Sequence, residues 1–195
     1  MTDDELSAYS AEHLMHELSM LWELAEILPS RKAGTETSAL LESFAVHLRN
    51  LIEFFCYPRK GGYVRAGHFF DDPGKWPRTL TPELKKLLKR ANTEVSHLTE
   101  HRVDGNPPQK EWDVGGMVTV IEKIAKTFAQ TASPKKLAPA VREFLNQPSG
   151  QMATWAEENV PHSNIAMQSM TVSPVSRTLR SPNPSTNTVI KLRNE

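Results

Sequence analysis

Apolar residues recur every three or four positions along roughly the first 145 residues, and this spacing predicts helices. The first such segment runs from about Asp4 to Leu28 and is followed by Pro29, which ends a helix. The second runs from about Thr37 to Cys56. Its apolar side chains fall within about 120° of a helical wheel, and they are Leu40, Leu41, Phe44, Leu48, Leu51, Ile52 and Phe55. Two long helices, each with one buried face, are therefore expected.

Three further helices are expected after a long loop. Thr81 followed by Pro82 is typical of a helix start, and the apolar stripe behind it predicts a helix over about 81–102. A helix over about 111–131 follows, and a Ser-Pro pair opens a shorter one over about 133–146. No strand alternation is evident. The sequence thus predicts an all-α fold, an up-down bundle of about five helices.

The connection between the second and third predicted helices is too long for a simple turn. Residues 57–81 hold four glycines and three prolines and show no sustained period. We expect an ordered loop whose aromatic residues fill the helical core, the alternative being a ligand or partner surface. These aromatic residues are Tyr63, Phe69, Phe70 and Trp76.

Composition changes after about residue 147, where Pro, Ser and Thr become frequent and apolar residues lose their period. Such a segment buries too little apolar surface to offset the entropy of ordering it. We therefore predict a helical domain over 1–147 and a disordered tail over 148–195. Two Ser-Pro pairs, at Ser173 and Ser181, leave open that the tail is a phosphorylated or partner-binding peptide.

Charge and cysteine content limit the kinds of partner and the kinds of metal site that the chain can have. Lys+Arg and Asp+Glu both number 23, so no long-range field favours nucleic acid or an anionic membrane, and such binding would have to be local. The single cysteine, Cys56, excludes an intramolecular disulfide and a thiolate zinc site, and we expect it to be a buried apolar residue. No secretory signal and no run of 18 apolar residues occurs, so we expect a cytoplasmic protein that does not span the membrane.

Polar residues line one flank of the third predicted helix, where Arg90, Glu94, His97 and His101 fall together on the helical wheel. A solvated face with an Arg-Glu pair is one reading of this stripe. The other is a site facing a groove or a dimer partner, in which a histidine exchanges protons and an arginine holds phosphate.

Arg90 and His97 are separated by six residues, and this spacing resembles the arginine-histidine signature of the HEPN superfamily. The resemblance implies a small helical domain that self-associates, with the arginine and histidine of two protomers cleaving RNA without a metal or other cofactor. The chain departs from the signature at Ala91, where the family usually has a polar residue. Arg49-Asn50 supplies the polar pair but is followed by apolar residues where the histidine should fall.

The same helix holds a second pattern, His97-x-x-Glu100-His101, which has the spacing of an inverted zinc-protease motif. Two histidines one turn apart can bind zinc, and the glutamate can activate water. That family needs a further acidic ligand in a larger mixed domain, which this chain does not offer. The motif is kept as an alternative to a metal-free site.

Further candidates lie on the second helix and at the end of the third. His47 lies at the edge of a core face, which favours a hydrogen-bonded packing residue, and Arg49 with Glu53 is expected to form a surface pair. Arg102 projects from an apolar stripe. We therefore predict a helical interaction module for RNA or a protein partner, with a ribonuclease as the alternative. Its expected binding residues are His47, Arg49, Asn50, Glu94, His101 and Arg102.

Overall fold

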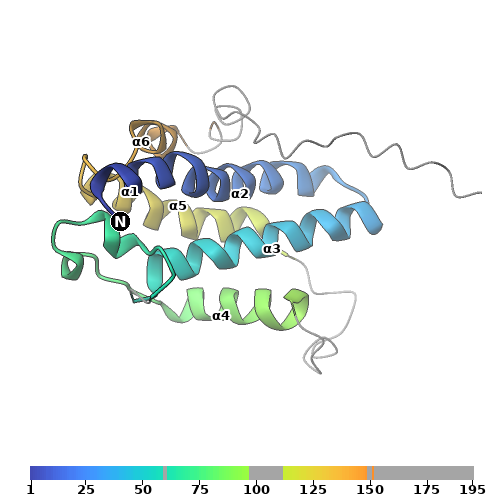
Figure 1. Ribbon diagram of the computed structural model, residues 1–195. Helices are drawn as coiled ribbons and strands as arrows, with labels where there is room; N and C mark the ends of the chain where they lie inside the picture. Colours follow the sequence, from blue (N-terminus) through green and yellow to red (C-terminus); the bar gives the residue numbers. More distant parts are fainter. Residues whose placement is uncertain (59–60, 97–111, 149–150, 152–195) are drawn as a thin grey trace, which may run out of the picture. The chain divides into compact units, whose positions relative to one another are not determined.

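The fold is all-α, as the periodicity predicts. The computed structural model describes residues 1–58, 61–96, 112–148 and 151, and no strand occurs among them. Five helical segments follow one another in these residues and form a bundle (Figure 1). The predicted tail lies outside the described residues, apart from its first position, Pro148, and Gln151. Within the described part of the chain, no helix is long and apolar enough to cross a membrane.

The first segment is a continuous path of three helices, α1 (Asp3–Tyr9), a π-helical turn η1 (Ser10–Leu14) and α2 (Met15–Ile27). Its start is capped because Thr2 Oγ1 accepts from the Glu5 amide while the Thr2 amide donates to Glu5. In the π turn, the buried Ser10 hydroxyl donates to Ser7 O at 2.8 Å and accepts from the Ala138 amide at 2.9 Å. Through Ser10, the π-helical turn therefore forms a hydrogen bond to the residue just before α6. The apolar period of the sequence did not predict this turn.

Helix α3 (Thr35–Cys56) packs against α2 and provides the centre of the core. The short 3-10 turn η2 (Leu28–Ser30) links the two helices. Five of the seven apolar residues predicted for the buried face of α3 are essentially inaccessible to solvent, and these are Phe44, Leu48, Leu51, Ile52 and Phe55. Leu40 and Leu41, nearer the start of the helix, are only partly buried.

Helix α4 (Pro82–Arg90) begins where the sequence predicts, with Thr81 Oγ1 accepting from the Leu84 amide at 3.2 Å. It continues as a π-helical segment η5 (Ala91–Ser96), after which the chain is not described until Trp112. Both α4 and η5 pack on α3.

Helix α5 (Val114–Thr131) starts slightly later than predicted, because Asp113 is its N-cap. It packs on α2, on α3 and on the last helix, α6 (Pro139–Asn146). The predicted start of that last helix at Ser133-Pro134 is wrong: residues 134–136 form a turn and α6 begins at Pro139. Pro139 disfavours helical geometry at the residue before it, and Ala138 is accordingly extended with ψ at 140°.

The long loop between α3 and α4 is ordered in its described residues and carries two short 3-10 turns, η3 (Ala66–Phe69) and η4 (Pro73–Lys75). Three of its four aromatic side chains fill the core as predicted: Phe69, Phe70 and Trp76 are 0–5% exposed and pack around Phe128 of α5. The prediction for Tyr63 is wrong, because its side chain is 53% exposed.

Candidate functional site

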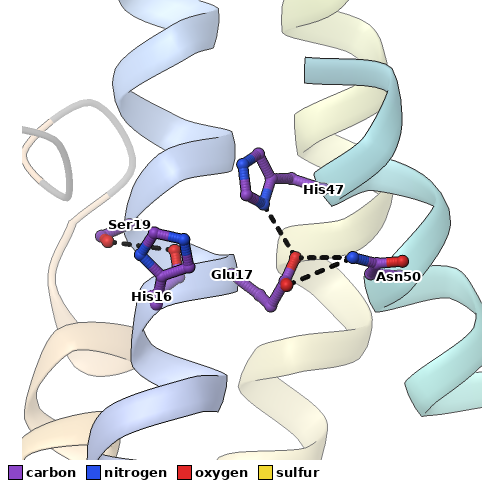
Figure 2. Close-up of polar contacts among 5 residues, drawn as sticks. All are labelled: His16, Glu17, Ser19, His47 and Asn50. Carbon is purple, nitrogen blue, oxygen red and sulfur yellow. Dashed lines mark hydrogen bonds and ion pairs between the residues drawn. The ribbon is translucent and has the colours of Figure 1, made fainter. Parts of the chain in front are cut away.

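A hydrogen-bonded cluster joins α2 to α3 through Glu17, whose carboxylate points at His47 and Asn50 (Figure 2). Nδ1 of His47 lies 2.8 Å from Glu17 Oε2, and Asn50 Nδ2 donates to both carboxylate oxygens at 3.2 Å. Helical spacing explains the arrangement, since His47 and Asn50 are three residues apart on α3 and therefore lie on one face. We call these three residues the Glu17 cluster.

The surroundings of the Glu17 cluster are partly aromatic and largely enclosed. His47 is only 9% exposed, and the His16 ring lies edge-on to it at 5.5 Å. His16 directly precedes Glu17 on α2, and its carbonyl accepts from Ser19 Oγ at 3.2 Å. These contacts agree with the expectation that His47 is a hydrogen-bonded residue. Among the described residues, no group of three or more His, Cys, Asp or Glu side chains is arranged to hold a metal ion.

A pocket of about 350 Å³ opens beside the cluster, and Glu17 and Asn50 form part of its wall. Three segments line it: the first helical path, the C-terminal half of α3 and the loop at 62–65. Its polar lining residues are Tyr9, His13, Glu17, Arg49, Asn50, Glu53, Tyr63 and Arg65. We call it the arginine pocket, because two guanidinium groups meet there.

Arg65 is the most deeply enclosed of the charged lining residues, with 8% of its surface exposed. Its Nη2 donates to Glu53 Oε2 at 3.4 Å, and its guanidinium lies 4.9 Å from the ring centre of Tyr63 and 5.9 Å from that of Tyr57. Its buried Nε has no hydrogen-bond partner. Because buried polar groups are nearly always paired, an unpaired donor on a side chain that lines a pocket is unusual.

Arg49 supplies the second guanidinium. Its Nε lies 3.9 Å from Glu53 Oε1, within the range of an ion pair but too far for a hydrogen bond, and it too is buried without a partner. The predicted i,i+4 pair of Arg49 and Glu53 is therefore present as an ion pair, but it is partly covered rather than fully exposed. The loop that carries Arg65 folds back over this end of α3, so that both side chains line the pocket and are only about one third exposed.

Tyr9 contributes a hydroxyl to the same pocket. Burial raises the pKa of Tyr9 above its ordinary value, and the negative charge of Glu17 raises it further, while Arg65 acts in the opposite direction. The phenol therefore stays protonated near neutral pH and can donate a hydrogen bond. The pocket thus combines several donors with two acidic groups that already have partners, since Glu17 binds His47 and Glu53 binds Arg65.

Arg90 is the one residue of the predicted stripe whose side chain lies in the described part of the chain, and it does not line the arginine pocket. Arg90 lies with its guanidinium 4.3 Å from the ring centre of Trp112 and lines a separate pocket of about 260 Å³ with Lys86 and Asp113. Glu94 falls within η5, but its side chain is not described. His97, Glu100, His101 and Arg102 lie outside the described residues, so the structure does not bear on the arginine-histidine or zinc readings.

The structure brings together Arg49 and Asn50, two of the predicted binding residues, with others that sequence reasoning did not connect to them. Glu17 belongs to the first predicted helix, whereas Tyr63 and Arg65 belong to the long loop after the second. No periodic signal in the sequence relates these positions, because they lie on different segments of the chain. Comparisons with protein-family models, with curated proteins and with solved structures found no match to this chain.

Proposed function

We propose that this chain is a helical binding module whose arginine pocket holds a phosphate group of single-stranded RNA. The observation that carries the proposal is the buried Nε of Arg65, which has no partner within the pocket it lines. Leaving a buried donor unpaired costs about 1–3 kcal/mol, and more when the donor is charged. A ligand oxygen would recover that free energy once a small shift of the Arg65 side chain brings Nε to the pocket wall.

Phosphate suits these donors better than a neutral ligand does. A guanidinium presents its N–H groups as a planar fork that matches two oxygens of a phosphate. Arg49 and Arg65 both have a buried Nε without a hydrogen-bond partner, and both form an ion pair with the same acid, Glu53. Glu53 already pairs with both guanidinium groups, so a phosphate would bind the N–H groups that Glu53 leaves unused.

Tyr63 favours a nucleic acid over an acidic peptide. Its exposed ring lies at the pocket next to Arg65, and an exposed aromatic face stacks on a nucleobase with about 1–3 kcal/mol per base. The pocket volume of about 350 Å³ is in the range of ligand sites, roughly 300–1,000 Å³. Because the formal net charge of the chain is zero, affinity depends on these local contacts rather than on a long-range field.

Fluorescence anisotropy with a short labelled oligouridylate tests the proposal. We expect Arg65→Lys, which keeps the charge but removes Nε, to weaken binding by about tenfold, as the loss of one charge-assisted hydrogen bond implies. Arg49→Gln should weaken binding similarly, and it should also make the affinity less dependent on salt. Tyr63→Ala should weaken it without changing the salt dependence.

Arg31→Gln is the matched control, because Arg31 is an exposed arginine that pairs with Glu36 at 3.6 Å and does not line the pocket. Its affinity should equal that of the unaltered protein. The proposal fails if the protein does not bind the oligonucleotide at low salt, or if Arg31→Gln weakens binding as much as Arg49→Gln. Binding of an acidic peptide at the same residues, with none of RNA, would assign the pocket to a protein partner instead.

A further inference from the structure

A second pocket, of about 570 Å³, lies between the start of α4 and the middle of α5. Helices α4 and α5 each pack against α3 but scarcely against each other, which leaves a space between them. Phe55 and Cys56, at the end of α3, line this space together with Trp76 from the long loop. It has no lining residue in common with the arginine pocket, and we call it the apolar pocket.

Most polar groups in the wall of the apolar pocket are already satisfied by the protein itself. The hydroxyls of Thr119 and Thr127 donate to carbonyls one turn earlier on α5, each at 2.9 Å. Trp76 Nε1 donates to Phe55 O at 2.6 Å, and Cys56 Sγ lies 3.6 Å from Thr79 O. The wall therefore offers methyl groups and rings to an occupant, and no buried donor there requires a polar ligand.

The rim carries one charge of each sign, Lys123 on α5 and Glu83 on α4, and both are exposed. Glu83 lies in the first turn of α4, where the positive end of the helix dipole already compensates a negative charge. Lys123 lies in the middle of α5, where no such compensation exists, and no carboxylate of the described residues lies within 4 Å of its ammonium group. Lys123 is therefore the rim charge that is more available to a ligand.

We propose that the apolar pocket is a second ligand site that binds a medium-chain fatty acid. The hydrocarbon chain would cover Phe55, Trp76 and Val120, and the carboxylate would lie at Lys123. Ligand pockets are usually lined by apolar side chains with a few polar groups that orient the ligand, and here Lys123 would take that part. Burial of the hydrocarbon chain supplies the affinity, at about 0.8 kcal/mol for each methylene group. The positive charge of Lys123 selects a negatively charged head group. The proposal is independent of the function proposed for the arginine pocket.

Cys56 provides a direct probe, because it is the only cysteine in the chain and lines the pocket at 5% exposure. The rate of its reaction with Ellman's reagent would be measured in the full-length protein at increasing decanoate concentration, below the micellar range. We expect saturable protection by decanoate, weaker protection by decanol and the weakest by decyltrimethylammonium. Equal protection by the cationic and anionic amphiphiles would overturn the proposal, as would a rate that decanoate leaves unchanged.

Two variants separate the chain site from the head-group site. Thr119→Trp places a large ring at the pocket from an exposed position of α5 and should abolish protection by decanoate. Thr131→Trp, exposed on the same helix but outside the pocket, is the matched control and should behave as the unaltered protein. Lys123→Gln should weaken decanoate binding about tenfold and leave decanol binding unchanged. The proposal is wrong if both tryptophan variants still bind decanoate, or if Lys123→Gln affects decanol and decanoate alike.

Discussion

Nδ1 of His47 lies 2.8 Å from Oε2 of Glu17 and joins α3 to α2 between residues 30 positions apart. Asn50 donates to the same carboxylate, so one partly buried acid satisfies two side chains of the neighbouring helix. Since Glu17 and Asn50 also line the arginine pocket, the cluster fixes the distance between two of its walls. Glu17 thus contributes both to the stability of the fold and to the shape of the arginine pocket.

The first prediction concerns Glu17→Gln, which keeps the shape of the side chain but replaces one acceptor oxygen by an NH₂ donor. That donor would face the donors of His47 or Asn50 and leave a partly buried hydrogen bond unmade, so we expect a loss of about 1 kcal/mol in the free energy of unfolding. Urea unfolding followed by circular dichroism measures it. Glu26→Gln, exposed on the same helix, should leave the midpoint in place. Equal midpoints for both variants would show that the cluster contributes little.

The second prediction uses two neighbouring glycines in the first turn of α5. The Gly116 amide donates to the N-cap carboxylate of Asp113 at 2.9 Å, and a Cβ at Gly116 would overlap that carboxylate. A Cβ at Gly115 would come no closer than 4.0 Å to Asp113.

Gly115→Ala should therefore stabilise the protein by up to about 1 kcal/mol through helix propensity. Gly116→Ala should gain the same helix propensity but lose the Asp113 N-cap hydrogen bond, which contributes about 1 kcal/mol. The free energy of unfolding should therefore stay nearly unchanged. Thermal unfolding of the two variants measures the difference. In an Asp113→Ala background the two substitutions should become equivalent, and a difference that persists there would argue against the cap as its cause.

The third prediction concerns pH and Cys56. Burial raises the pKa of the Cys56 thiol from 9.0 to about 11, so the folded protein keeps a proton that the unfolded chain releases earlier. This contribution to stability is complete below pH about 9 and is lost as the pH rises toward about 11. Stability measured by urea unfolding between these values should fall more steeply for the unaltered protein than for Cys56→Ala. Parallel curves would mean that the thiol ionises equally in both states.

The fourth prediction separates a binding module from the two enzymatic alternatives. The guanidinium of Arg90 lies 4.3 Å from the ring centre of Trp112. The spacing between Arg90 and His97 is a property of the sequence, and His97 lies outside the described residues. We expect a labelled RNA to stay intact with the unaltered protein and with His97→Ala, and metal analysis to find no stoichiometric zinc. Cleavage that disappears in both His97→Ala and Arg90→Lys would establish the ribonuclease. Cleavage that a chelator abolishes, together with bound zinc, would establish the zinc hydrolase.

Helical period and helix-start signals were sufficient to predict five helical segments and most of the core. Both signals are local: the buried face of α3 follows from a repeat along the chain, and Thr81 caps α4 through a neighbour three residues away. The burial of Phe69, Phe70 and Trp76 also followed, because large aromatic residues in a long loop need a core to cover them. The predicted start of α6 at Ser133-Pro134 was wrong, because Pro139 disfavours a helical conformation at Ala138 and the helix begins only after it.

The sequence by itself determined that this chain is helical and which helix faces are buried, since those properties depend on spacings of three and four residues. Only the tertiary structure decided that Arg65 lies beside Arg49, that Glu17 lies between His47 and the arginine pocket, and that Tyr63 points outward. These relationships join the first helix, the end of α3 and the loop after it. They depend on the path of the chain between helices, which is set by packing over long sequence distances and leaves no periodic trace in the order of residues.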